Sequence, residues 1–414
     1  MGLARPRALH IAPAMPARGG NGLAMRQGLF LEALSRVCDA ELVVLPVAGP
    51  AGIAPTLAAE LGVPATIAPV AGRRDTQFEL LSRIKDPAAR AAAFAAYGRS
   101  SLAAGLSLPV LAELRQRFGA HRYDLVHIGR SYLADTLTAL ETPGAVTLDF
   151  DEDEQTSYRE IAAGHRQASR HAAAAWAEAE ATAISALIRH HASRVELGFV
   201  AGAPDAAAIG ARHPGLRLEI VGNAIAMPPH PRHDDDGATL LFVGSFGYAP
   251  NVDAVRWFAE AIWPTVRATA SRPPRLLIVG RDAAPDLLKT ADHPGIEVLG
   301  EIGDIADAYR RATLVIAPLR AGAGTRLKLI EAAAHGVPIV ATGLAARGLE
   351  LKAPDHLWLA DDPAAFAAVV LEALDRPAER AGRAALALEL VRTRHDRDIA
   401  VDQLACRLAA ILAR

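Results

Sequence analysis

Residues 313–343 constrain the fold of this chain more than any other stretch. Two short apolar runs, at 314–319 and 337–341, flank a loop with two glycines and a segment with helical spacing of its apolar residues. This order predicts a strand, a glycine loop, a helix and a second strand, which is a βαβ unit. Gly336 and Pro338 end the helix, because glycine accepts the left-handed cap and proline cannot continue the helix.

The glycine loop of this unit has the features of an anion site. Gly322 and Gly324 let backbone N–H groups approach a ligand, and the helix start at Thr325 favours negative charge. Three basic residues stand at the loop and helix start: Arg320, Arg326 and Lys328. Glu331, one turn further along, can accept hydrogen bonds from ribose hydroxyls. The pattern predicts a diphosphate site, with an ordinary βαβ unit whose charges are merely solvated as the alternative.

The run PLRAGAGTRLKLIEAAAHGVPIVAT closely resembles the donor-binding segment of the family 4 glycosyltransferases. These are retaining enzymes of the GT-B fold that use nucleotide-sugar donors, and the subgroup resembled carries a GxGTRLK-x-x-E segment. The resemblance implies that Glu331 grips the ribose of the donor. Many members carry another glutamate eight residues earlier, which touches the donor sugar, whereas this chain has Ala323. The identity of the sugar is therefore left open.

Composition narrows the class of partner. Of the 414 residues 51% are hydrophobic, which is ample for large cores, and 44 basic against 46 acidic residues leave a net charge of −2. Such a balance argues against a dedicated nucleic-acid binder and favours small-molecule partners. The two cysteines, Cys38 and Cys406, are too few for a disulfide framework or a metal site.

The chain shows no signal for membrane insertion. Prolines interrupt the apolar stretch near the N-terminus, and no apolar run reaches about 18 residues, so we expect neither a signal peptide nor a spanning helix. We expect a cytoplasmic protein, and peripheral contact with the inner face of the membrane stays open.

Two predicted strands in the first half lead into candidate ligand residues. Gly19 and Gly20 follow the first strand, and the resemblance implies that this loop lies against the phosphates and sugar of the donor. A permissive loop without a ligand is the alternative.

His127 and Arg130 lie at or just past the end of a later strand, where α/β sheets place ligands. In the family a histidine in a comparable position lies close to the donor sugar, so His127 is a candidate catalytic residue and Arg130 an acceptor contact; a core histidine is equally compatible.

An acidic run, DFDED at residues 149–153, follows another predicted strand. It twice spells the D-x-D that binds a metal and a diphosphate in a different glycosyltransferase fold, GT-A. Here the run opens a long predicted helix, where carboxylates are favoured by the helix dipole and need no metal. We therefore predict no metal site, and the alternative use of the run is an acidic acceptor-side wall with Asp151 as its candidate.

Two glycines mark ligand loops in the second half. Gly244 follows a predicted strand and precedes a helix, and many relatives carry an arginine and a lysine around this loop to neutralise the donor diphosphate. Neither stands between Gly244 and Val255, so charge balance makes the basic residues of the later glycine loop the candidates to replace them. Gly300 lies in a stretch that resembles the base-binding region of the family. Asp304 is expected to cap the helix that follows.

The best linker candidate is residues 225–238, with three prolines and an acidic triplet. On either side we predict two facing Rossmann-like domains of the GT-B fold: 1–224 on the acceptor side and 239–378 on the donor side. Residues 379–414 are predicted to form two amphipathic helices that return to the first domain, as is usual in GT-B proteins. The family resemblance is dense over 239–375 and diffuse before it.

Together these features predict a hexosyltransferase-like enzyme of polysaccharide biosynthesis that transfers a sugar from a nucleotide sugar to a glycan, lipid-linked or small-molecule acceptor. The resemblance implies retention of configuration, and because basic side chains stabilise the leaving diphosphate, no metal or other cofactor is required. Arg326 and Lys328 are the candidates for that catalytic charge. One alternative is a noncatalytic sugar-nucleotide-binding protein, which Ala323 keeps open. The other is an epimerase or phosphorylase of the same fold, which would place more catalytic carboxylates or a cofactor lysine in the second half.

Overall fold

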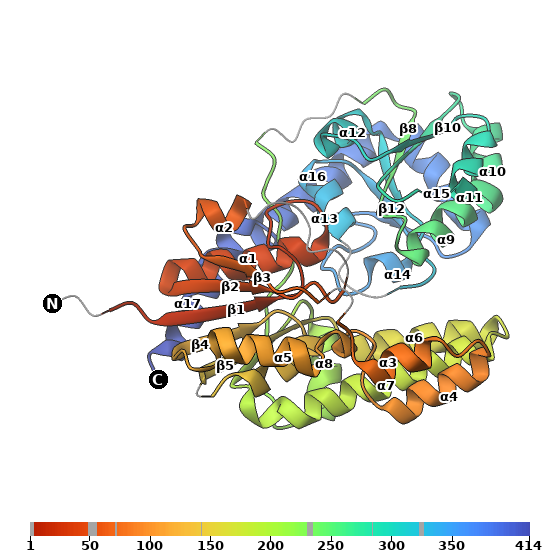
Figure 1. Ribbon diagram of the computed structural model, residues 1–414. Coiled ribbons are helices and arrows are strands. Elements are labelled where there is room, and N and C mark those ends of the chain that lie inside the picture. The colour runs from red at the N-terminus through yellow and green to blue at the C-terminus, as the bar shows by residue number, and fades with distance from the viewer. Residues whose placement is uncertain are drawn as a thin grey trace. The chain divides into compact units, whose positions relative to one another are not determined.

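The computed structural model describes residues 4–48, 56–70, 73–141, 143–229, 235–283, 285–322 and 327–414 (Figure 1). The chain divides into two compact units. The first comprises Met1–Asn223 together with Arg397–Arg414, and the second comprises Ala224–Asp396. Each unit is built on one parallel sheet. Across the described ranges, no helix combines the length and apolar character needed to span a bilayer.

The first unit contains a seven-stranded sheet in the order β3-β2-β1-β4-β5-β6-β7. Its strands are β1 (Arg7–Ala12), β2 (Asp39–Val44), β3 (Ala65–Ile67), β4 (Tyr123–Ile128), β5 (Pro143–Asp151), β6 (Leu197–Val200) and β7 (Leu218–Ile220). From β1 the chain builds outward to β3, then returns to the other side of β1 with β4. The order therefore reverses between β1 and β4, which is the topological switch point where α/β sheets bind ligands.

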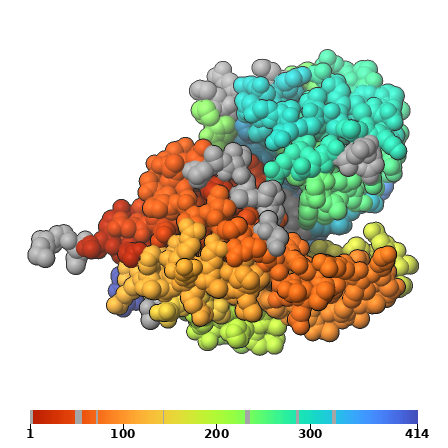
Figure 2. Space-filling model, in the orientation of Figure 1, coloured from red at the N-terminus to blue at the C-terminus, as the bar shows by residue number. Residues whose placement is uncertain are grey.

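Helices cover this sheet and extend beyond it. They are α1 (Gly22–Val37), α2 (Thr56–Glu60), α3 (Thr76–Ser82), α4 (Pro87–Tyr97), α5 (Leu108–Leu114), α6 (Glu154–Gln167), α7 (His171–His191), α8 (Ala203–Arg212) and α17 (Arg397–Leu412). Helix α1 begins at an Asn21 cap, whose side chain accepts from the Ala24 N–H at 2.8 Å. Helix α6 packs along α7, which also contacts α4. Figure 2 shows α3 and α4, in orange, at the surface of this unit.

The second unit contains a six-stranded sheet in the order β10-β9-β8-β11-β12-β13. Its strands are β8 (Thr239–Val243), β9 (Arg275–Val279), β10 (Ile296–Gly300), β11 (Leu314–Ala317), β12 (Ile339–Ala341) and β13 (Trp358–Leu359). Its helices are α9 (Ala249–Trp257), α10 (Trp263–Thr269), α11 (Pro285–Leu288), α12 (Ile305–Arg311), α13 (Leu327–Ala334), α14 (Gly343–Ala346), α15 (Pro363–Asp375) and α16 (Pro377–Arg394). The predicted βαβ unit is β11, α13 and β12, and Asp304 caps α12 as expected, at 2.9 Å from the Ala306 N–H. The order of this sheet reverses between β8 and β11.

The two C-terminal helices lie in different units, whereas the sequence led us to expect both on the first domain. Helix α17 packs against α1 in the first unit, and α16 packs against α13 and α15 in the second. Arg380 of α16 explains the difference, because it donates to the carbonyl oxygens of Ala373 (2.9 Å) and Leu374 (2.6 Å) and pairs with Asp235 at 3.0 Å. Periodicity predicts an apolar helix face but does not say which sheet that face covers.

The end of the predicted linker is anchored to the second sheet. Residues 230–234 lie outside the described ranges, but Asp236 accepts from the backbone N–H groups of Ala238 and Thr239, both at 2.9 Å, and pairs with Arg275 at 2.8 Å. Burial alone would raise the pKa of Asp236, and these hydrogen bonds outweigh it and lower the pKa to about 2. The acidic residues here therefore fix the start of β8 instead of solvating a linker.

Gly280, directly after β9, has no room for a side chain. Its φ is +155°, and a Cβ there would lie 1.7 Å from the carbonyl oxygen of Gly244, which is backbone and cannot move aside cheaply. We expect Gly280→Ala to destabilise the second unit by about 1–3 kcal/mol or more. Denaturant unfolding followed by tryptophan fluorescence would measure it, because three tryptophans lie in this unit: Trp257, Trp263 and Trp358.

Gly303→Ala is the matched control, since a Cβ at Gly303 meets no atom within 4 Å. Its unfolding midpoint should stay close to that of the wild type. Equal midpoints for the two variants would contradict the close approach of the backbone at Gly280.

Candidate functional site

The carboxyl ends of β8 and β11 meet at the switch point of the second sheet, where open α/β sheets bind ligands. Gly244 directly follows β8, while Arg320 and Gly322 follow β11. Lys328 and Glu331 stand on α13, the helix after β11. Gly324, Thr325 and Arg326 lie outside the described residues, as does Ala323. The structure thus gathers five of the predicted donor-side residues around one pair of strand ends.

Glu331 is a half-buried carboxyl group on α13, the helix that follows β11. The Tyr309 hydroxyl donates to its Oε2 at 3.1 Å, and the fully buried Tyr309 ring stacks on His335 with centroids 4.7 Å apart. Burial raises the pKa of Glu331 to about 7, although Tyr309 and the charge of Lys328 both act to lower it. A carboxyl group whose pKa is raised by burial is typical of a functional site.

Lys328 reaches across to the segment that follows β8. Its Nζ donates to Oδ1 of Asn251 at 2.7 Å and lies 4.7 Å from the centroid of the Phe242 ring. Asn251 was not among the predicted site residues. Because 77 positions separate Asn251 from Lys328, no local pattern in the sequence indicates their contact.

Arg320 is already engaged by an acid. Its guanidinium forms two hydrogen bonds with Asp253 of α9, at 2.7 and 3.1 Å, and lies over the Trp257 ring at 5.2 Å. This pairing offsets part of the positive charge that the sequence offered to a diphosphate. Lys328, whose ammonium is bound by the Asn251 amide, is the other described basic candidate.

Glycines bring the two strand-end segments together. Gly322 has a φ of +102°, and a Cβ there would lie 2.5 Å from the Tyr248 hydroxyl and 3.1 Å from the Pro250 ring. The segment after β11 therefore contacts the segment after β8 at a position that requires glycine. Gly300 stands elsewhere, at the end of the edge strand β10, two strands away from the switch point.

In the first unit, Gly19 and Gly20 lie between β1 and α1, at the switch point of their own sheet. Both are exposed, and a Cβ at either would meet no atom within 4 Å. Packing inside the unit therefore does not require glycine at either position, although the φ of +100° at Gly20 favours it there.

The structure places His127 in the core and not at an open sheet edge. It is fully buried within β4, stacked on Phe30 of α1 at 4.1 Å, with Nδ1 2.9 Å from the Thr147 hydroxyl. Burial, followed by the charges of His10 and Arg26, lowers the pKa of His127 well below its ordinary value, so the ring is neutral. The side chain points from the sheet toward the helix layer, which is the core arrangement that the sequence left open.

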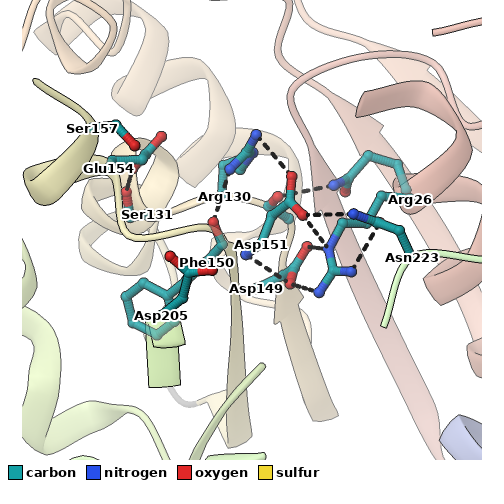
Figure 3. Close-up of polar contacts among 12 residues, drawn as sticks. Arg26, Arg130, Ser131, Asp149, Phe150, Asp151, Glu154, Ser157, Asp205 and Asn223 are labelled. Atoms are coloured by element: carbon teal, nitrogen blue, oxygen red, sulfur yellow. Dashed lines mark hydrogen bonds and ion pairs between the residues drawn. The ribbon is translucent and has the colours of Figure 1, made fainter. Parts of the chain in front are cut away.

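Arg130 and Asp151, two separate acceptor-side candidates from the sequence, meet at the carboxyl ends of β4 and β5 (Figure 3). Arg130 Nη2 lies 3.1 Å from Asp151 Oδ2, and its Nη1 donates to the Phe150 carbonyl oxygen at 2.8 Å. Asp151 has a φ of +61°, and its Oδ1 accepts from the Asn223 amide at 3.1 Å. Both side chains are mostly buried, and each offsets much of the charge of the other.

Arg26 completes this network from α1, and no local pattern in the sequence indicated its role. Its Nε and Nη2 each donate to Asp149 at 2.7 Å, and its Nη1 donates to the Val221 carbonyl oxygen at 2.9 Å. The sequence predicts a strand that ends at Phe150 and a helix from about Glu154. In the structure β5 extends to Asp151 and α6 starts at Glu154, so Asp149 and Asp151 belong to the end of the strand and not to the start of the helix. Arg26, which is fully buried, and Arg130, whose side chain is 12% exposed, pair with these carboxylates. Within the described ranges, no group of three or more His, Cys, Asp and Glu side chains is arranged to hold a metal ion.

Comparison with known proteins relates the second unit to a known family. Residues 237–376 match the family model for "Glycosyl transferases group 1". These residues coincide closely with the second sheet and its helices, including the switch point with Lys328 and Glu331. This match supports a glycosyltransferase. A comparison with curated proteins found no match.

Solved structures define the fold. Sucrose-phosphate synthase from Thermosynechococcus elongatus is 14% identical, with a TM-score of 0.66 and coverage of 99% of both chains. Anabaena HepE in complex with UDP and glucose is 14% identical, with a TM-score of 0.63, over 98% of this chain and 100% of that one. A glycosyltransferase from Rickettsia africae is 10% identical, with a TM-score of 0.59 and 99% coverage of both. The chain has the GT-B fold, with two Rossmann-like parallel sheets, as predicted.

Proposed function

We propose that the protein is a retaining glycosyltransferase of family 4 that takes its sugar from a nucleotide-sugar donor. The donor binds at the carboxyl ends of β8 and β11. The observation that carries this proposal is Glu331, a half-buried carboxyl group with a raised pKa on the helix after β11, in the domain that matches the glycosyltransferase family. Burial of an acid costs stability. Hydrogen bonds from a ligand to this carboxyl group would explain why the acid is retained despite that cost.

The proposed roles follow from the chemistry of the side chains. As a carboxylate, Glu331 accepts hydrogen bonds from the two ribose hydroxyls. Lys328, one turn earlier on α13, places positive charge beside the diphosphate and stabilises the negative charge that develops as it leaves. Arg326 would add to that charge from the glycine loop. In this proposal basic side chains supply the stabilisation, so the reaction needs no metal or other cofactor.

The acceptor side rests on the first unit. Arg130 and Asp151, the candidate acceptor contacts, lie at the ends of β4 and β5 of this unit, while the exposed Gly19 and Gly20 keep their proposed role as donor contacts. We propose a glycan, a lipid-linked sugar or a small molecule as acceptor, in polysaccharide biosynthesis at or near the inner face of the membrane.

A second candidate function is sugar-nucleotide binding without turnover. It is favoured by the burial of His127, which removes the predicted catalytic histidine from the sheet edge. Ala323 in place of the family glutamate points the same way. Both candidates use the same donor site, so only formation of a glycosylated product separates them.

A ligand screen tests the donor site. The purified chain is heated with UDP-, GDP-, ADP- and dTDP-sugars, starting with UDP-glucose, since UDP and glucose are the ligands in the HepE structure. A donor at one hundred times its Kd should stabilise the protein by about 2.7 kcal/mol, and Glu331→Ala should weaken that effect. Glu389→Ala, an exposed change on α16, is the control and should respond like the wild type.

The outcomes separate the proposals. Saturable stabilisation followed by product formation with an acceptor supports the transferase, and stabilisation without product under every acceptor condition supports the noncatalytic binder. If no nucleotide shifts the melting temperature at millimolar concentration, the donor site is refuted.

A further inference from the structure

Asn251 joins the two segments that meet at the switch point of the second sheet. It is buried near the start of α9, with 6% of its surface exposed. Its Nδ2 donates to the Ser245 carbonyl oxygen at 2.8 Å, in the segment after β8, and its Oδ1 accepts from Lys328 Nζ at 2.7 Å, on the helix after β11. A carbonyl oxygen needs a donor and an ammonium needs an acceptor, so the two partners together fix the orientation of the amide.

The geometry constrains the ammonium of Lys328 from two sides. One contact is the Asn251 amide, and the other is the face of the buried Phe242 ring, 4.7 Å from Nζ. A lysine side chain is ordinarily flexible, and ordering it on ligand binding costs conformational entropy. Since Asn251 and Phe242 are both uncharged, they hold the ammonium in place without cancelling its charge.

Gly244 makes room for this arrangement. A Cβ at Gly244 would lie 2.8 Å from Nδ2 and 2.9 Å from Cγ of Asn251, so any larger residue would displace the amide. In the sequence, Gly244 marks a candidate donor-binding loop. In the structure the space beside it is occupied by Asn251, which links this glycine to Lys328 through a single side chain.

We infer that Asn251 is a positioning residue that holds the Lys328 ammonium where the diphosphate of the donor binds. This inference rests on the proposed function and adds a residue to it. The amide acts through Lys328 and need not touch the ligand itself. Its contribution is preorganisation, because the lysine is already ordered before the diphosphate arrives.

The rival explanation is that Asn251 merely stabilises the segment after β8 through Ser245. A purely structural loss would weaken the binding of every part of the nucleotide. A loss of lysine positioning would weaken only the binding of the phosphates. Comparing a nucleoside diphosphate with its nucleoside therefore separates the two explanations.

The experiment measures Kd by calorimetry for UDP, GDP, ADP and dTDP and for the matching nucleosides, with wild type, Asn251→Ala, Lys328→Met and the double variant. Asn251→Ala should weaken diphosphate binding by about three- to tenfold, the usual net size for one intramolecular hydrogen bond, with nucleoside binding unchanged. Lys328→Met should weaken it at least as much, and the double variant no further than Lys328→Met.

Two further variants keep the test decisive. Asp362→Ala removes the cap of α15, a hydrogen bond at 2.9 Å to the Ala365 N–H, and should leave both affinities unchanged. If Asn251→Ala does not fold, Asn251→Asp retains the acceptor oxygen but places a negative charge against the ammonium. It should also weaken the diphosphate and spare the nucleoside.

The inference is overturned if Asn251→Ala weakens nucleoside and diphosphate equally, or if its effect adds fully to that of Lys328→Met. If wild type binds none of the four diphosphates, the proposed function itself fails. That outcome is distinct, because it is seen in the unmodified protein.

Discussion

Replacing Arg26 by alanine is expected to destabilise the first unit by about 3–5 kcal/mol. The Arg26 and Asp149 side chains are both completely buried, and two hydrogen bonds of 2.7 Å join them. Without the guanidinium, Asp149 keeps its negative charge away from water and close to Asp151, whose Oδ1 lies 3.5 Å from Arg26 Nε. Urea unfolding followed by circular dichroism would measure the loss.

Two comparisons show whether the lost ion pair is the cause. Arg159→Ala changes an exposed arginine of α6 and should alter the free energy of unfolding by less than about 0.5 kcal/mol. Arg26→Met with Asp149→Leu removes both charges and should cost less than Arg26→Met alone, because no unpaired charge is left. An Arg26→Ala variant as stable as Arg159→Ala would contradict the buried pair.

The second sheet could be predicted from sequence because its signals are local. Gly336 and Pro338 end α13, Asp304 caps α12, and short apolar runs mark the strands. Parallel strands are joined by helices, so the order of such runs alone indicates a doubly wound sheet. Gly244, Lys328 and Glu331 could be assigned to one site for the same reason, since they follow adjacent strand ends.

Contacts between distant residues could not be predicted in this way. Arg26 and Asp149 are 123 positions apart, and nothing near either one indicates the other. His127 illustrates a second limit of sequence-based prediction, which concerns the direction in which a strand side chain points. A parallel strand is buried on both faces, so alternation does not tell which of its side chains point into the helix layer. The strand was correctly placed, but whether His127 faces a ligand or Phe30 depends on where α1 packs.

The stability of the wild type is expected to fall relative to Glu331→Gln as the pH rises from about 5 to 8. Folding raises the pKa of Glu331 from 4.5 to about 7, chiefly by burial. Above pH 4.5 the unfolded chain releases a proton that the folded chain retains, so unfolding becomes easier with each pH unit until the folded carboxyl also ionises near pH 7. A shift of this size corresponds to about 3 kcal/mol.

Glutamine does not titrate, so the variant lacks this penalty. Denaturant unfolding at pH 5, 6, 7 and 8 should therefore give a difference between variant and wild type that grows with pH and levels off above pH 7, while Glu389→Gln on the surface of α16 shows no such trend. A difference that does not change with pH would mean that Glu331 is ionised throughout. If the variant gains stability at pH 8 and also loses nucleotide affinity, the stability cost of burying Glu331 is tied to ligand binding. A residue retained only for folding would not destabilise the folded state.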